Sequence, residues 1–212
     1  MKKIALTLTV LLVLVLALAL TACGGTAETT TENTTEAVTT IEQTITTQPV
    51  VTTTVPVTTT EAPVTQYPIP EGYALYDNGD IAFLYPEGMT KQEGSPVIIV
   101  NTTNGNNITV VYEPKSNFYE TLNNEQYYNA MKPFADAAGA ILKSPSVEQI
   151  KANANGITLT KMSHTLLTNG VSVKQAIFAT TVGDKTYSVT VTEMVTDETL
   201  VNTVLNSLRH TK

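Results

Sequence analysis

Two histidines and their neighbours are the first residues that could do chemistry in this chain. Nucleophilic catalysis needs a hydroxyl, thiol or amine beside a base, and only His164 and His210 offer an imidazole. Ser163 and His164 are adjacent in a predicted strand, so their side chains point to opposite faces and form no dyad. His164 shares its face with Met162 and Leu166, which predicts a packed or rim histidine. His210 is expected at a frayed end. We therefore predict no catalytic residue.

Acidic residues in two places could bind a cation. The segment Asp77-Asn78-Gly79-Asp80 offers oxygen ligands, but Asn-Gly between two strands is a hairpin signal, and the longer acidic run of a calcium loop is absent. Glu193, Asp197 and Glu198 precede a predicted helix, where capping and the helix dipole explain them better than a cation site. With one Cys and two His, the chain has no zinc-ligand spacing. No metal and no cofactor is predicted.

Three tyrosines near the first predicted helix offer a surface for stacking. Tyr119, Tyr127 and Tyr128 could form an aromatic patch for a glycan or a peptide. Tyrosines at helical spacing are more often the half-buried edge of a core, and we favour that interpretation. The Asn-Gly pairs that begin at 78, 104, 155 and 169 predict turns, and none has the spacing of a phosphate-binding loop.

The single cysteine follows a segment typical of a secretory signal peptide. Lys2 and Lys3 precede an apolar run from Ile4 to Leu20, and small residues stand just before Cys23. The run is marginal for a membrane-spanning helix, which needs about 20 residues, and no basic cluster follows it. We predict a signal peptide over residues 1–22. One cysteine also excludes any disulfide within one copy.

The segment Leu20-Thr21-Ala22-Cys23 resembles a lipobox, the cleavage motif of bacterial lipoproteins. The resemblance implies cleavage before Cys23, a diacylglyceryl thioether on its sulfur, and anchoring to the outer face of the bacterial cell membrane. Two acyl chains give stable anchoring where one is marginal. An ordinary signal peptide with a chance cysteine is the alternative.

Composition changes abruptly after the cysteine. Residues 23–66 are rich in Thr, with scattered Glu and Pro and no Lys or Arg, and Leu, Phe and Tyr are absent until Tyr67. Such a segment buries too little apolar surface to offset the entropy of ordering, which predicts a disordered, partly extended stalk. Thr-rich stalks that contain Pro are often O-glycosylated, and an unmodified spacer is the other possibility.

Residues 67–212 have the length and composition of one globular domain. The chain carries a formal charge of −7, and taking away Lys2, Lys3 and the five stalk glutamates leaves −4 for this domain. No basic patch or basic helix appears, which argues against nucleic acid as a partner.

The pattern of the domain predicts strands, a helix, a meander and a last helix. Early strands are expected at 73–76, 81–85, 97–100 and 108–112, and later ones at 157–167, 171–182 and 186–194. A helix over 124–138, capped by Thr121 or Asn123, is expected to bury Tyr128, Met131, Ala135 and Ala138 and to kink or split at Pro133. Residues 141–155 fit a strand or a short helix.

The last helix begins after Thr196 or Asp197 and has an apolar stripe that includes Leu200, Val204 and Leu208. Arg209 and His210 are placed in its final turn. Elements in this order predict an α+β fold, an antiparallel sheet covered by helices.

The same order resembles the PsbP-like/DcrB-like family. The resemblance rests on the segment from Ile81 to Met89, with its Tyr85-Pro86 step, on Asn155-Gly156 before a long strand, and on the Tyr187 strand followed by a helix ending near Leu208. It covers about residues 73–209. It implies an α/β/α sandwich and a non-catalytic binding or assembly role, and it supplies no catalytic set.

The sequence thus predicts a lipid-anchored, extracytoplasmic module of the cell envelope that is not an enzyme. Its expected partners are the membrane, through the lipid on Cys23, and an envelope protein or a small ligand. Two alternatives stay open. An envelope hydrolase would show a deep pocket where His164 or a carboxylate such as Glu193 has a shifted pKa. A wall-spanning spacer or adhesin-like module would show no pocket.

Overall fold

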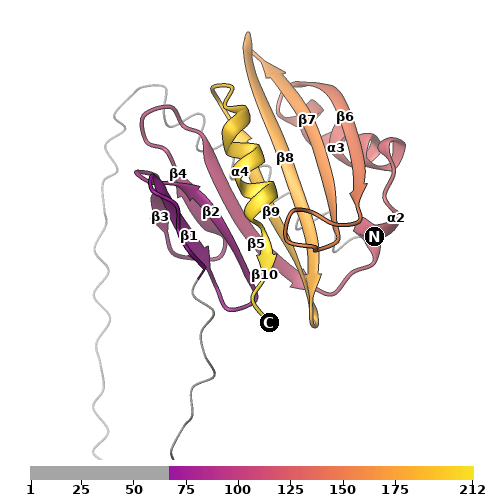
Figure 1. Ribbon diagram of the computed structural model, residues 1–212. Helices are drawn as coiled ribbons and strands as arrows, with labels where there is room; N and C mark the ends of the chain where they lie inside the picture. Colours follow the sequence, from indigo (N-terminus) through magenta and orange to yellow (C-terminus); the bar gives the residue numbers. More distant parts are fainter. Residues whose placement is uncertain (1–66) are drawn as a thin grey trace, which may run out of the picture. The chain divides into compact units, whose positions relative to one another are not determined.

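The computed structural model describes residues 67–212, and residues 69–212 belong to one compact unit (Figure 1). The predicted signal peptide (1–22), the lipidation site Cys23 and the predicted stalk (23–66) lie outside the described residues. Within the described part of the chain, no helix has the length and apolar character needed to cross a membrane. The predicted α+β class is confirmed.

Alternating apolar and polar residues build a seven-stranded antiparallel sheet. Its order is β3-β4-β5-β9-β8-β7-β6. The strands are β3 (Thr90–Gln92), β4 (Val97–Val100), β5 (Asn107–Pro114), β6 (Ile141–Ile150), β7 (Leu159–Thr168), β8 (Val171–Val182) and β9 (Lys185–Glu193). Asn169 and Gly170 both have positive φ, 49° and 80°, in the tight turn that Asn-Gly predicts between β7 and β8. Residues 141–150, ambiguous in sequence, are the edge strand β6, with a bulge between Lys143 and Ser146.

A smaller sheet joins the two ends of the domain. It consists of β1 (Tyr73–Asp77), β2 (Ile81–Pro86) and β10 (Arg209–His210), in the order β1-β2-β10. The placement of Arg209 and His210 in a last helical turn is therefore wrong. The helix ends at Ser207, Leu208 is extended, and the two residues pair with Ala82 and Ile81 instead. The last backbone groups of a helix have no partner within the helix, whereas pairing with β2 gives the backbone groups of these two residues hydrogen-bond partners.

Three helices are described: α2 (Phe118–Thr121), α3 (Asn124–Ala137) and α4 (Glu198–Ser207). Asn123 caps α3 in a reciprocal box with Gln126. The helix is not split at Pro133. Proline has no N–H, so the carbonyl of Asn129 loses its partner in the helix, but both residues are exposed to solvent.

The buried face of α3 agrees with the predicted one at Met131 and Ala135 and differs from it at Tyr128. Tyr127, Met131 and Ala135 are buried at a spacing of four, while Tyr128 is 37% exposed. Tyr127 falls in register with Met131 and Ala135 and contributes its ring to the core.

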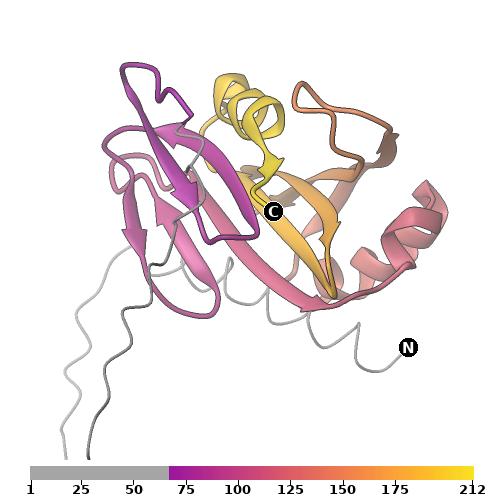
Figure 2. The ribbon, with the colours of Figure 1, turned by 60° about the horizontal axis from the view of Figure 1, so that its bottom comes forward.

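The helices pack on opposite faces of the large sheet, as Figure 2 shows, and two cores result. One core contains α4, the small sheet and residues such as Phe178 and Val189. The other contains α2, α3 and residues such as Met162 and Ile177. Successive side chains of β8 alternate between the two faces, so this strand belongs to both cores.

Candidate functional site

A cavity of about 460 Å³ lies beside the start of α4, on the α4 face of the strands β7, β8 and β9. Register places Thr165, Lys174 and Glu193 in one row across these strands, so all three side chains project from the same face. Glu198, Val201 and Asn202 of α4 form the wall of the cavity. Ser163 and Lys161 extend the floor along β7.

Glu193, the last residue of β9, is a buried acidic group that lines the cavity. It is only 4% exposed, and its Oε1 atom is buried with no hydrogen-bond partner. Burial raises the pKa of this carboxyl, while the backbone of Asp197 and the charge of Lys174 act in the opposite direction. A buried carboxylate with a free oxygen is costly, so the site favours a donor placed in the cavity.

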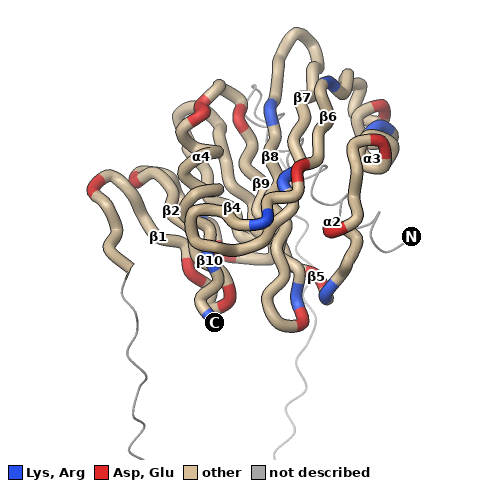
Figure 3. Tube along the Cα trace, turned by 45° about the vertical axis from the view of Figure 1, so that its right-hand side comes forward, with Lys and Arg blue, Asp and Glu red and all other residues tan. Residues whose placement is uncertain are grey.

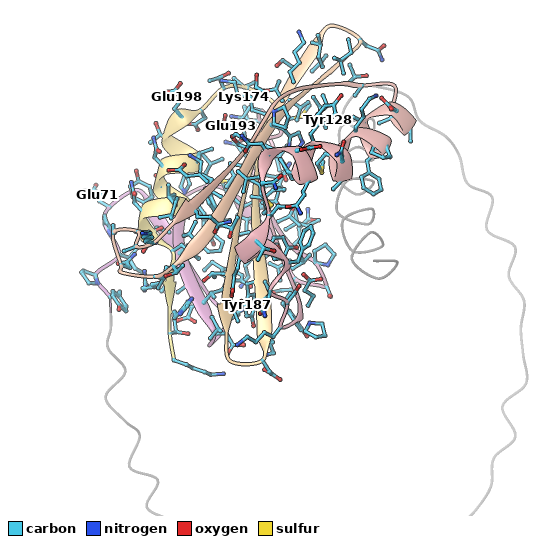
Figure 4. The ribbon with its side chains drawn as sticks, turned by 90° about the vertical axis from the view of Figure 1, so that its right-hand side faces the viewer. Glu71, Tyr128, Lys174, Tyr187, Glu193 and Glu198 are labelled. Atoms are coloured by element: carbon cyan, nitrogen blue, oxygen red, sulfur yellow. The ribbon has the colours of Figure 1, made fainter. Side chains whose placement is uncertain are left out.

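Two lysines of the neighbouring strands also line the cavity. Lys174 of β8 is exposed and forms no ion pair within 4 Å among the described residues. Lys161 of β7 lies 3.7 Å from Glu148, a long ion pair. In Figure 4, Lys174, Glu193 and Glu198 lie near one another beside the start of α4. Figure 3 shows acidic positions near the start of α4 and basic positions on the strands next to it.

His164 borders the cavity, but its imidazole serves the opposite face of the sheet. Its Nδ1 atom lies 2.6 Å from the hydroxyl of Tyr127 in α3, and the residue is 3% exposed. Burial lowers the pKa of His164 to about 4, and a polar contact with Gln175 only partly offsets this. The prediction of a packed histidine is confirmed, and register places Ser163 on the other face.

The acidic residues before α4 divide into two groups. Asp197 is the N-cap and accepts a hydrogen bond from the backbone of Leu200, and Glu198 lies in the first turn. These are the capping and dipole roles predicted from the sequence. Glu193 takes neither role.

The segment Asp77 to Asp80 forms the predicted turn. The backbone N–H of Gly79 donates to Asp77, and Asn78 accepts from Asp80 and Ile81. The Asp80 carboxylate accepts from Lys185 at 2.9 Å, from the Tyr187 hydroxyl and from Lys212. These donors hold the pKa of Asp80 far below its usual range. Asp80 thus links the small sheet to β9 and to the C-terminal residues.

The tyrosines do not form a surface patch. Tyr119 is 8% and Tyr127 is 2% exposed, and both belong to the core under α2 and α3. Only Tyr128 reaches the surface. The core-edge interpretation is confirmed, because a ring that stacks on a ligand must be accessible.

A second cavity of about 360 Å³ lies near α2, and five of its fourteen lining residues are threonines. His210 borders it, with Nε2 3.0 Å from the Thr180 hydroxyl. His210 is therefore half-buried in β10, and the expectation of a frayed end is wrong. In the part of the chain that the structure describes, no three His, Cys, Asp or Glu residues gather closely enough to hold a metal ion.

Sequence reasoning did not identify Lys161 and Lys174. Each is a lone lysine in a strand, and only the register of β7, β8 and β9 brings them to the face where α4 begins. The sequence does indicate that Lys174 and Val173 point to opposite faces of their strand. It does not indicate that Lys174 lies beside Glu193, because that depends on the register between β8 and β9.

The solved structures that are similar to this chain include a Bacteroides protein and a mycobacterial protein. No family model matches the chain, and no curated protein matches it. A protein of Bacteroides thetaiotaomicron VPI-5482 is similar with a TM-score of 0.41 and 11% identity, over 62% of this chain and 45% of that one. This chain therefore spans less than half of the Bacteroides protein.

LpqN of Mycobacterium tuberculosis, described as involved in cell envelope biogenesis, is similar with a TM-score of 0.38 and 11% identity, over 66% of this chain and 91% of that one. Both TM-scores are below 0.5, so neither likeness carries an argument about family or function.

Proposed function

We propose that this chain is a lipid-anchored, extracytoplasmic, non-catalytic binding module of the bacterial cell envelope, and that the cavity beside α4 holds a small ligand. The observation that carries the binding role is Glu193, which lines a cavity of about 460 Å³ and has a buried carboxylate oxygen without a hydrogen-bond partner. A group of this kind is stabilised when a ligand supplies the missing donor.

Anchoring rests on the segment Leu20-Thr21-Ala22-Cys23 and the apolar run before it. A binding or assembly role is also what the resemblance of the sequence to the PsbP-like/DcrB-like family implies, although no family model matches the chain. The position of His164 supports a non-catalytic role, because its Nδ1 contacts Tyr127 rather than a nucleophile. The cavity counts against a mere wall-spanning spacer.

The anchor can be tested in growing cells with an alkyne-labelled fatty acid. The native chain should incorporate the label and lose its first 22 residues, whereas Cys23→Ala should do neither. Thr26→Ala, three residues further on, is the matched control and should behave like the native chain. Added protease should digest the native chain in cells stripped of their outer layers. Labelling of Cys23→Ala at the native level would contradict the anchor.

The ligand role can be tested by a fragment screen on the full chain in detergent. Fragments that bind the cavity should perturb the NMR signals of Glu193, Glu198 and Lys174 and should leave the threonine-lined cavity near α2 unchanged. A screen in which no fragment of any charge perturbs these signals would contradict a ligand-binding role for this cavity.

An envelope hydrolase is the second candidate, and one observation favours it. Burial raises the pKa of Glu193 in a cavity, which is the environment of a general acid. Chromogenic esters and glycosides should then be turned over by the native chain and not by Glu193→Gln. Absence of turnover in both proteins supports the non-catalytic proposal.

A further inference from the structure

We propose that the cavity beside α4 binds a small zwitterion, a molecule of amino-acid or dipeptide size with one ammonium and one carboxylate group. The proposal rests on the binding role proposed above and names the chemical class of the ligand. It follows from the acidic and basic groups that line the cavity together.

The two glutamates that line the cavity favour a ligand with an ammonium group. Oε1 of Glu193 is buried without a partner, and Glu198 lies beside it on the wall formed by α4. A charged N–H donor makes the stronger kind of hydrogen bond to a carboxylate and also offsets its buried charge. Two carboxylates are too few for an all-protein calcium site, which takes six to eight oxygen ligands.

The two lysines that line the cavity favour a ligand with a carboxylate group. Lys174 stands opposite Glu193 on the neighbouring strand but forms no ion pair within 4 Å among the described residues. Lys161 is held only at 3.7 Å by Glu148. Both ammonium groups therefore keep the capacity to donate to an anion. A lysine donates as a point charge and tolerates several carboxylate orientations.

The arrangement matches a ligand that carries both charges. Glu193 and Glu198 come from β9 and α4, whereas Lys174 and Lys161 come from the neighbouring strands β8 and β7, so groups of both signs line the cavity. Lys174 is the direct cross-strand neighbour of Glu193, so an acidic and a basic group lie next to each other. These four residues sum to zero charge when all are ionised. A purely cationic or purely anionic ligand would leave one pair unmet, whereas a zwitterion satisfies both. A cavity of about 460 Å³ suits a molecule of this size.

Calorimetry with four matched probes tests the proposal on the full chain in detergent. Alanyl-alanine carries both charges, alaninamide only the ammonium, N-acetylalanine only the carboxylate, and N-acetylalaninamide neither. Alanyl-alanine should bind best, each singly charged probe roughly tenfold or more weaker, and the neutral probe weakest, because each charged hydrogen bond contributes about a factor of ten or more.

Two variants test which residue binds the ammonium group and which binds the carboxylate group of the ligand. Glu193→Gln should weaken alanyl-alanine and alaninamide and leave N-acetylalanine unchanged. Lys174→Met should weaken alanyl-alanine and N-acetylalanine and leave alaninamide unchanged. Lys174 is exposed, so its substitution tests the proposal even where the Glu193 variant folds poorly. Lys115→Met, at an exposed lysine outside the cavity, is the control and should bind all probes like the native chain.

The outcomes separate this proposal from the one on which it rests. Equal binding of all four probes, or variants that weaken every probe alike, would overturn the zwitterion while leaving a ligand-binding cavity. No binding of any probe at millimolar concentration would overturn the zwitterion as well. The ligand-binding role itself falls only if the fragment screen also finds nothing in the cavity.

Discussion

His164 and Tyr127 form a buried polar pair between β7 and α3. Their hydrogen bond of 2.6 Å lies in a core otherwise built from apolar residues such as Met162 and Ile177. A neutral imidazole is tolerated there, whereas a protonated one would place a charge in an apolar environment. The pair therefore couples the packing of α3 to pH.

We predict that this pair makes the domain less stable in mild acid. The pKa of His164 is lowered to about 4 from 6.5, so the unfolded chain takes up a proton before the folded one does. The stability that neutral His164 contributes to the folded state is fully present above pH 6.5 and is lost as the pH falls toward 4. The two pKa values give a total loss in the free energy of unfolding of about 3 kcal/mol. Urea unfolding at several pH values measures it.

The control for this prediction is His164→Leu, which leaves the Tyr127 hydroxyl unpaired at every pH. It should be less stable than the native chain at pH 7 and should lose less stability between pH 6.5 and 4. Parallel pH curves for the two proteins would show that His164 does not titrate in this way.

For single residues, the sequence predicted which side chains pack in the core, such as His164, but not which ones line the cavity, such as Glu193. Met162, His164 and Leu166 alternate within one strand, so the face of His164 could be predicted from local periodicity. Glu193 could not be assigned to a cavity, because its environment depends on where α4 begins and on which lysines β8 and β7 bring alongside.

Among the elements, α3 is the one whose start is most clearly specified by local chemistry. The Asn123 side chain accepts from the backbone of Gln126 at 2.9 Å, and the Gln126 side chain accepts from the backbone of Asn123 at 3.1 Å. These bonds satisfy two backbone donors that a helix start leaves free. Asn117, at the start of α2, makes no such bond.

Substituting Asn123 should therefore destabilise the domain. Asn123→Ala removes the capping acceptor and should lower the free energy of unfolding by about 1 kcal/mol, as loss of an N-cap typically does. Asn117→Ala is the matched control, because it removes the same side chain where no cap bond exists. Denaturant melts of both variants measure the effect, and equal losses would contradict a role for the capping box.

Elements with strong periodicity or turn signals were predicted, and three short ones, α2, β3 and β10, were not. The four-residue α2 and the three-residue β3 carry no periodicity long enough to read. Strand β10 was missed because helix propensity favours a continuing α4, while pairing with β2 decides the outcome. Ser207 marks the change, since its hydroxyl accepts from the backbone of Leu84 at 2.8 Å.

On the scale of the whole molecule, β8 holds the two cores together. Phe178 packs with α4 on one face, Ile177 packs with the α3 side on the other, and both neighbours of β8 are long strands. Strand β6, by contrast, is an edge strand with a bulge. Local stability should therefore fall from the centre of the sheet toward β6.

Hydrogen exchange should follow this gradient. We expect the backbone amides of β8 and β9 to exchange most slowly, at rates set by global unfolding, and those of β6 near the bulge to exchange much faster. Exchange measured residue by residue by NMR tests this expectation. Exchange of β8 at the rate of β6 would show that the two cores open independently.

The small sheet also has a consequence for the order in which the chain is made. Strand β2 obtains its second neighbour, β10, from the far end of the sequence, and Asp80 and Lys212 are 132 residues apart. A ribosome adds about 5–20 residues per second, so roughly 7–26 s separate the synthesis of these partners. During that interval Ile81 and Phe83, which are fully buried in the finished domain, lack their cover. The nascent chain should therefore remain unfolded and depend on a chaperone until its last strand has been made.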